Sequence, residues 1–283
     1  MEFRKPENVK KGVLERAPKA YDNLEFIHSK DGRIIRMIAE YQYPEQHFRK
    51  YGIKGSIVFY GSARTLSLDE FDLKVKELND KLSKAKPEEK EKIAEELNNF
   101  MKTFEMTNTY NECVILANKL GEWISTLPKS QKLLICTGGG PGMMEAANRG
   151  AYLANQPSIG LNISLPFEQY PNSYITPDLN FEFHYFFMRK FWFVYLAKAI
   201  VAMPGGLGTL DELMEILTLK QTRKVTKPLP IVLYNEKFWK KLIDFEFLIE
   251  MGMISKEDLN LFQYCNSPDE AFDFLKANIV LPN

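Results

Sequence analysis

The chain has 283 residues, of which 45% are hydrophobic and 26% are charged, so it can bury a sizeable core and is not a disordered protein. Its 37 basic and 37 acidic residues give a formal net charge of zero, which excludes a general attraction to nucleic acid or to anionic membranes. No apolar stretch approaches the roughly 20 residues that cross a bilayer, and the charged N-terminus lacks the apolar centre of a signal peptide. Three scattered cysteines, Cys113, Cys136 and Cys265, fit neither a disulfide framework nor a metal site. We therefore expect them to be reduced and buried in a cytoplasmic protein.

The chain falls into three parts, namely residues 1 to about 50, residues from about 51 to 130, and a more regular part that begins at residue 132. Residues 1–50 mix polar and aromatic side chains and predict an N-terminal helical extension. Residues 51–283 are expected to form one domain, which begins with a strand over 56–60 and a turn over 61–64. A charged stretch with helical spacing predicts a protruding pair of helices at about 67–105, with the charges facing solvent. A further helix covers about 107–126.

The second half alternates between apolar strands and helices. The predicted strands cover 133–136, 158–163, 181–186, 199–203, 229–234 and 261–265. Continuously apolar strands separated by helices are typical of a parallel sheet that is covered on both faces. We therefore predict an α/β fold with a sheet of about seven strands. A last helix begins at the capping box 267–270.

A glycine-rich turn at 137–142 links a predicted strand to a helix. Its glycines let a backbone approach a ligand closely, and the helix that follows presents free N–H groups and a positive dipole end, which suit a phosphate. Met143 occupies the place of the third glycine in a dinucleotide fingerprint, and the chain contains no P-loop sequence. The alternative is a tight turn that binds no ligand.

A second glycine-rich segment, residues 203–212, also joins a strand to a helix, and its turn offers more backbone donors. Glu212 follows Thr209 by three residues, which is the spacing of a capping box. Spacing alone supports a helix cap and a functional carboxylate equally, and the two roles are compatible.

Arg189 and Lys190 lie at the expected start of the helix that precedes the second turn. Cations at this position oppose the helix dipole, so either they have a function or they form an ordinary surface pair. Arg64 follows the first strand directly and could reach the same edge of the sheet. His184 and Trp192 are more typical of structural residues.

Together these motifs resemble the LONELY GUY (LOG) family, often labelled lysine decarboxylase-like. The family hallmark P-G-G-x-G-T-x-x-E matches residues 204–212 at each fixed position. The glycine turn, the Arg-Lys pair and the turn at 61–64 match other family motifs, and the resemblance covers about residues 50–65 and 130–235.

The resemblance implies a Rossmann-like fold and a phosphoribohydrolase that cleaves AMP or an N6-modified AMP to free base and ribose 5-phosphate. It implies catalytic roles for Arg189 and Glu212, no metal or cofactor, and a homodimer or larger homo-oligomer with active sites near the subunit interface. The expected substrate-binding residues are Gly61, Ser62, Arg64, Gly138, Gly139, Gly140, Gly142, Met188, Lys190, Pro204, Gly205, Gly206, Gly208 and Thr209.

The chemistry of the residues agrees with that reaction. Cleavage of a ribosyl–base bond builds positive charge on the sugar, and a carboxylate such as Glu212 stabilises that charge and orients water. Arg189 offers a fixed fork of donors to a phosphate, a ribose or a leaving base. The alternative is a carrier of nucleotides or of molybdopterin cofactor, which would keep the glycine turns but would not need both charged residues.

Overall fold

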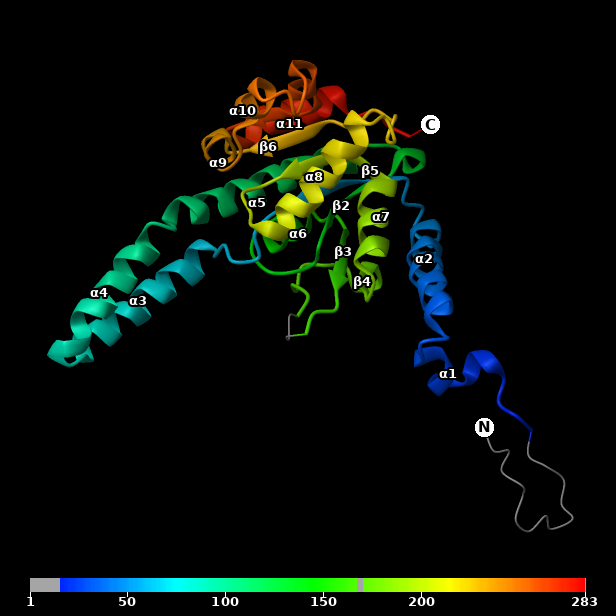
Figure 1. Cartoon of the computed structure of the whole chain (residues 1–283), viewed down its shortest axis with the longest axis horizontal. Coiled ribbons are helices and arrows are strands. Elements are labelled where there is room, and N and C mark those ends of the chain that lie inside the picture. Colours follow the sequence, from blue (N-terminus) through cyan, green and yellow to red (C-terminus); the bar gives the residue numbers. More distant parts are fainter. Residues whose placement is uncertain (1–15, 167–169, 283) are drawn as a thin grey trace, which may run out of the picture. The chain divides into compact units, whose positions relative to one another are not determined.

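The computed structural model describes residues 16–166 and 170–282 (Figure 1). Its contacts divide the chain into two compact units, one ending at Gln42 and the other running from Tyr43 to Asn283. The first unit contains a short 3-10 helix, η1 (Ala20–Asp22), the helix α1 (Leu24–His28) and the beginning of α2 (Arg33–Lys50). The remainder of α2 belongs to the second unit, where Phe48 packs edge-on against Phe181 and Trp192 with ring centres 5.4 and 5.2 Å apart.

The second unit is built on a seven-stranded sheet whose paired strands are all parallel. Its strands are β1 (Gly55–Tyr60), β2 (Leu133–Thr137), β3 (Ser158–Ile163), β4 (Asn180–Phe183), β5 (Ala197–Ala202), β6 (Ile231–Tyr234) and β7 (Gln263–Cys265). Their order in the sheet is β4-β3-β2-β1-β5-β6-β7. The strand order reverses between β1 and β5, and ligands of open α/β sheets bind at the carboxyl ends of strands at such a point. The predicted Rossmann-like α/β fold is therefore confirmed.

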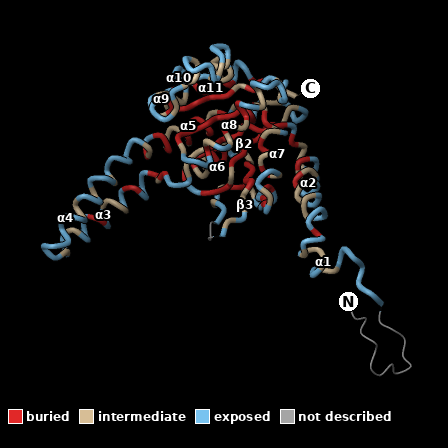
Figure 2. Tube along the Cα trace, viewed as in Figure 1, coloured by how far each residue is buried: buried red, intermediate tan, exposed pale blue. Residues whose placement is uncertain are grey.

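Helices connect the strands and cover both faces of the sheet (Figure 1). They are α3 (Leu68–Lys84), α4 (Pro87–Met101), α5 (Phe104–Ser125), α6 (Met143–Leu153), α7 (Phe186–Leu196), α8 (Leu207–Gln221), α9 (Glu236–Leu242), α10 (Phe245–Glu250) and α11 (Pro268–Asn278). Three short 3-10 helices complete the unit, namely η2 (Lys129–Gln131), η3 (Pro177–Leu179) and η4 (Lys256–Leu261). The helices α3 and α4 form a hairpin that extends from the sheet, and its residues are mostly exposed (Figure 2).

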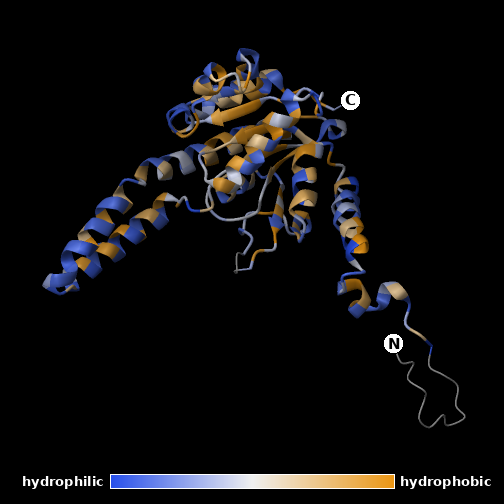
Figure 3. Cartoon of the chain, in the orientation of Figure 1, coloured by the Kyte–Doolittle hydropathy of each residue, from blue (hydrophilic) through white to orange (hydrophobic). Residues whose placement is uncertain are grey.

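Alternating side chains of β1 show how the two faces are covered. Phe59 lies in one buried cluster with residues of α5, α6 and α11. The next residue, Tyr60, points to the opposite face and meets Phe193 of α7, with ring centres 5.3 Å apart. All six residues of β1 are buried, and the strands form a hydrophobic centre (Figure 3). Buried apolar strands of this kind are the basis for the sequence prediction.

The structure bears on two further predictions, the state of the cysteines and the length of one strand. Cys113, Cys136 and Cys265 are buried and unpaired, as expected. The strand predicted over 181–186 is too long, because β4 ends at Phe183 and α7 begins at Phe186. Only Phe181 and Phe183 of that segment are buried, so the later aromatic residues belong to the helix.

Within the described residues, no helix is long and apolar enough to cross a membrane.

Candidate active site

Three turns meet where the strand order reverses. The backbone N–H of Ser62, after β1, donates to the carbonyl of Pro204, after β5, over 3.1 Å. The carbonyl of Ser62 accepts from the N–H of Met143, the first residue of α6, over 2.9 Å. The turns at 61–64, 138–142 and 203–206 therefore form one connected edge, as expected from the carboxyl ends of neighbouring parallel strands.

The backbone of the glycine-rich turn itself requires two of its glycines. Gly139 and Gly142 have φ angles of +75° and +71°, a region that side chains with a Cβ rarely adopt. A Cβ on Gly139 would stand 2.2 Å from the Asn162 side-chain oxygen, and one on Gly142 would stand 2.3 Å from the Ser62 carbonyl oxygen. These two glycines are therefore explained by the fold before any ligand is considered.

A buried polar network fixes the same turn to the segment after β3. The Asn172 side-chain amide donates to the carbonyls of Gly139 and Gly140, each over 3.0 Å, and to Oδ1 of Asn148, also over 3.0 Å. Asn148 Oδ1 also accepts from the Thr137 hydroxyl over 2.7 Å. Two carbonyl groups of the turn thereby have hydrogen-bond partners within the protein. The sequence analysis missed Asn172, since a single asparagine after a strand is an ordinary loop residue.

In the second turn, one glycine is required by packing and two others border open space. A Cβ on Gly205 would stand 2.2 Å from the Thr209 hydroxyl oxygen, so Gly205 is needed for packing. Gly206 and Gly208 are exposed, and a Cβ on either would meet nothing within 4 Å. The space above these two glycines is open to a ligand.

Of the two roles that the Thr209–Glu212 spacing left open, the helix cap is not formed. Helix α8 begins at Leu207 with Gly206 as its N-cap, and no side chain caps it. The extended backbone of Gly206 leads directly into the helix, so Thr209 lies inside the first turn and packs beside Gly205. Glu212 is therefore beyond the first turn and is free for another role.

Glu212 forms an ion pair with Arg189. The Nη2 of Arg189, on α7, donates to Oε1 of Glu212, on α8, over 2.9 Å, and the two side chains are only 11% and 12% exposed. A Cβ placed on Gly138 would lie 3.8 Å from Nη1 of the same guanidinium. The pair therefore lies between the first glycine turn and the helix that follows the second.

The surroundings raise the pKa of Glu212 to about 7. Burial is the main cause, and the positive charge of Arg189 opposes it without cancelling it. The neighbouring carboxylates Asp211 and Glu215 raise this pKa further. A carboxyl group that titrates near neutral pH suits acid–base or electrostatic work in a reaction.

Arg189 is also held by aromatic rings. Its guanidinium lies 5.4 Å from the ring centre of Phe186 and 5.5 Å from that of Phe193. Its Nε is buried and makes no hydrogen bond within the described residues. Two rings and one carboxylate thus hold the guanidinium, while its buried Nε is left without a hydrogen bond among the described residues.

Lys190 has partners as well. Its Nζ lies 2.8 Å from the Asp211 carboxylate and 3.1 Å from that of Glu215. Burial lowers the pKa of Lys190, but the bonds to these two carboxylates outweigh burial and raise it. The acidic residues of α8 therefore explain the two adjacent cations on α7, and an unpartnered surface pair is excluded.

The remaining predicted residues lie around this centre at different depths. Met188 is half-buried on α7, and Arg64 is exposed, with its backbone N–H bonded to the Ser62 hydroxyl over 3.0 Å. Trp192 is buried in the core, as expected of a structural residue, and His184 is exposed. Tyr60 was missed by the sequence analysis, and its pKa is raised well above the usual value by burial and by the charge of Glu212.

Comparison with known proteins finds one matching family model. A family model described as "Possible lysine decarboxylase" matches residues 144–275, which contain the Arg-Lys pair and the whole P-G-G-x-G-T-x-x-E hallmark. The resemblance to the LOG family is therefore confirmed.

Two curated proteins share parts of the sequence of this chain. A pyrimidine/purine nucleotide 5'-monophosphate nucleosidase of Escherichia coli K12 is 31% identical over 121 residues, which are 38% of this chain and 25% of that protein. The chain thus matches about a quarter of the length of this relative. A protein of Oryza sativa, described as a probable cytokinin riboside 5'-monophosphate phosphoribohydrolase, is 26% identical over 157 residues, which are 52% of this chain and 69% of the relative.

Two solved structures that align with most of this chain share less than 20% of its sequence. The molybdenum cofactor binding protein of Rippkaea orientalis is 18% identical, with 78% of this chain and 94% of that chain covered and a TM-score of 0.43. The Moco carrier protein of Chlamydomonas reinhardtii is 17% identical, with 79% and 96% covered and a TM-score of 0.43.

Proposed function

We propose that the chain hydrolyses the N-glycosidic bond of a nucleoside 5′-monophosphate, giving the free base and ribose 5-phosphate. The observation that carries this proposal is the buried Arg189–Glu212 pair, which lies beside the first glycine turn and on the helix that follows the second. The names of the Escherichia coli and Oryza sativa relatives, a nucleotide nucleosidase and a phosphoribohydrolase, support the same reaction.

The two glycine turns hold the 5′-phosphate. The first turn leads into α6 and the second into α8, so N–H groups at two helix starts point towards the same edge of the sheet. Gly206 and Gly208 leave open space where a phosphate or sugar can approach the backbone. Gly61, Gly138 and Gly140 belong to the turns at the same edge, and Lys190, which is paired with Asp211 and Glu215, is proposed to contact the substrate there as well.

Glu212 acts on the sugar. When the bond to the base breaks, positive charge develops on the ribose, and an ionised Glu212 beside C1′ stabilises it. The same carboxylate accepts hydrogen bonds from water and orients it for attack on C1′. With a pKa of about 7, a substantial fraction of Glu212 is ionised at neutral pH.

Arg189 keeps the carboxylate in place and contacts the substrate. Its Nη2 is bonded to Glu212, while its buried Nε has no hydrogen-bond partner among the described residues. The Nη1 group of the same guanidinium carries further N–H donors, which can serve the leaving base or a phosphate oxygen. Both members of the pair therefore act in the reaction, which a carrier would not require.

AMP is the proposed substrate, with N6-modified AMP as a further one. The test is to incubate the purified chain with AMP and to measure adenine and ribose 5-phosphate by chromatography. Equal amounts of both products are expected, and EDTA should leave the rate unchanged because the proposed chemistry uses neither metal nor cofactor. Tight binding of AMP without release of adenine would overturn the proposal and favour a carrier.

The proposed assembly is a homodimer or a larger homo-oligomer, and the proposed location is the cytoplasm. Helix α7 exposes Phe186, Phe187 and Tyr195 by 50%, 54% and 56%, and such a group of aromatic residues is typical of an interface. The same helix carries Arg189, so a partner seated on it would lie near the active site. Three buried, unpaired thiols support a reducing compartment.

A further inference from the structure

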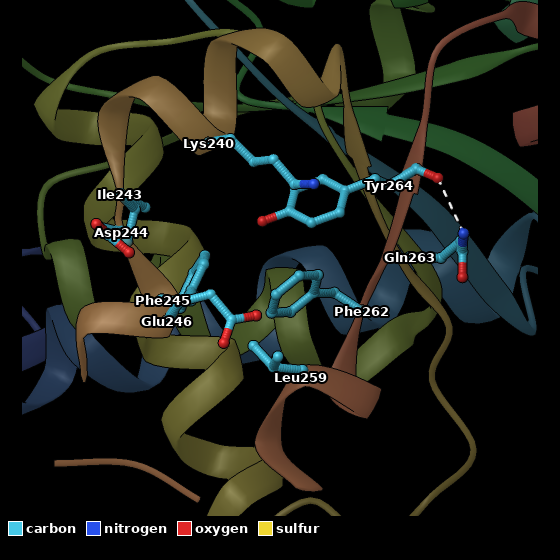
Figure 4. A pocket seen from close by; sticks show the side chains of 9 residues that line it. All are labelled: Lys240, Ile243, Asp244, Phe245, Glu246, Leu259, Phe262, Gln263 and Tyr264. Carbon is cyan, nitrogen blue, oxygen red and sulfur yellow. Dashed lines mark hydrogen bonds between the residues drawn. The ribbon is translucent and has the colours of Figure 1, made fainter. Parts of the chain in front are cut away.

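A separate cavity of about 460 Å³ lies beside the edge strand β7 (Figure 4). Side chains from α9, α10, η4 and β7 line it, and it shares no residue with the glycine turns or with the Arg189–Glu212 pair. Its lining is Lys240, Ile243, Asp244, Phe245, Glu246, Leu259, Phe262, Gln263 and Tyr264. None of these residues has a role in the reaction proposed above.

Three aromatic rings form a continuous wall of this cavity. The ring centres of Phe245 and Phe262 are 5.0 Å apart, and those of Phe262 and Tyr264 are 5.3 Å apart. The face of an aromatic ring carries partial negative charge and attracts cations. The protein itself provides an example, since the ammonium of Lys240 lies 5.5 Å from the ring centre of Tyr264 (Figure 4).

The charges around the wall are unbalanced towards negative. Lys240, the one cation in the lining, is already paired with Glu236 at 2.7 Å. Among the described residues, neither Asp244 nor Glu246 has an ion-pair partner, and Asp244 only caps α10 by accepting from the Phe247 N–H over 2.9 Å. Burial and the charges of Glu236 and Glu246 raise the pKa of Tyr264, so the negative charge reaches the wall.

We propose that this cavity binds a small organic cation with an alkylammonium head. Such a cation fits the chemistry of the site, because the aromatic wall and the two carboxylates attract it while the rings accommodate its methyl or methylene groups. A hard metal ion fits less well, since the described residues contain no cluster of three metal-ligating side chains. An anion would face two uncompensated carboxylates.

The test measures binding of choline to the full chain by NMR or calorimetry. The matched ligand is 3,3-dimethylbutan-1-ol, which has the shape of choline but no charge. Choline is expected to bind at least about tenfold more tightly than the neutral alcohol, which is the selectivity that cation–π contact and a nearby carboxylate provide. Because the measurement uses no turnover, its outcome is independent of the proposed hydrolase reaction.

Two variants and one control locate the binding site. Glu246→Gln and Phe262→Leu should each weaken choline binding several-fold and leave the binding of the alcohol nearly unchanged. The control is Glu250→Gln, which removes the same charge from an exposed residue of the same helix outside the cavity lining, and choline binding should be unaffected. Equal binding of choline and the alcohol would overturn the proposal, as would equal effects of Glu246→Gln and Glu250→Gln.

Discussion

The Arg189–Glu212 pair concentrates the proposed chemistry in two side chains. Burial destabilises the ionised form of Glu212, and the positive charge of Arg189 offsets only part of this effect. The pKa of the carboxyl group is therefore about 7 and not 4.5. The folded protein therefore holds this proton more tightly than the unfolded chain does. The stabilising contribution of Glu212 is complete below about pH 4.5 and is lost as the pH rises through about 7.

Replacing Glu212 with glutamine tests the catalytic role directly. A glutamine side chain can still accept the hydrogen bond from Arg189, but it cannot stabilise positive charge on the ribose. We expect Glu212→Gln to lower kcat by about 10²–10⁴ while thermal unfolding shows a folded protein. The measurement is the initial rate of adenine release from AMP.

A half-buried glutamate on α5 provides the control. Glu112 on α5 accepts a hydrogen bond from the Tyr234 hydroxyl over 3.1 Å, and burial raises its pKa too. Glu112→Gln removes a carboxylate whose hydrogen bond goes to Tyr234 and not to Arg189 or the glycine turns, so the rate should stay within about twofold. If both variants lost activity equally, or if Glu212→Gln kept normal turnover, Glu212 would have only a structural role.

The pH dependence of kcat/KM provides another prediction at this scale. Since the ionised carboxylate is the active form, kcat/KM should rise from the acid side with a midpoint of about 7 and level off above it. The measurement is adenine release between pH 5 and 9 at low AMP concentration. An acid limb near the ordinary glutamate pKa of 4.5 would contradict the assignment.

At the scale of the elements, the glycines at the start of α8 have different roles: Gly205 is needed for packing, whereas Gly208 leaves space for a ligand. Gly208 lies inside the helix with open space where a Cβ would stand. Alanine at this position should therefore raise the free energy of unfolding by about 0.5–1 kcal/mol, because glycine weakens a helix. The same methyl group would occupy ligand space, so kcat/KM for AMP should fall by about tenfold or more.

Gly205→Ala is the contrasting variant. Its Cβ would stand 2.2 Å from the Thr209 hydroxyl oxygen, so it should lower stability and activity together. Denaturant unfolding and AMP turnover measured on both variants separate the two effects. A Gly208→Ala protein with full activity would show that this glycine does not face the substrate.

Much of this arrangement can be predicted from the sequence, and the failures have physical reasons. Apolar strands and glycine turns predict the sheet and its ligand edge, because burial and close backbone approach leave strong residue patterns. The Thr209–Glu212 spacing is misleading, since a helix can begin at a glycine such as Gly206 without a side-chain cap. The contacts of Arg189 with Glu212 and of Asn172 with the glycine turn join distant segments, and no local pattern encodes them.

At the scale of the whole molecule, the aromatic face of α7 predicts self-association. We expect light scattering to show a dimer or larger assembly at micromolar concentration. A Phe187→Asp/Tyr195→Asp double variant should be monomeric, because both side chains are more than half exposed and would place charge in the interface. Leu73→Asp on α3, which alters a 67% exposed leucine elsewhere, should leave the assembly intact. A stable wild-type monomer would contradict the prediction.

The measurement that tests the central claim most directly compares kcat/KM for AMP and adenosine. A 5′-phosphate bonded to N–H groups at two helix starts makes several charge-assisted hydrogen bonds, each contributing about 1.5–3 kcal/mol. Two such bonds already correspond to a preference for AMP of about a hundredfold or more. We predict that adenosine is a very poor substrate. Similar kcat/KM values for the two compounds would contradict the account, because the glycine turns would then not be the phosphate site.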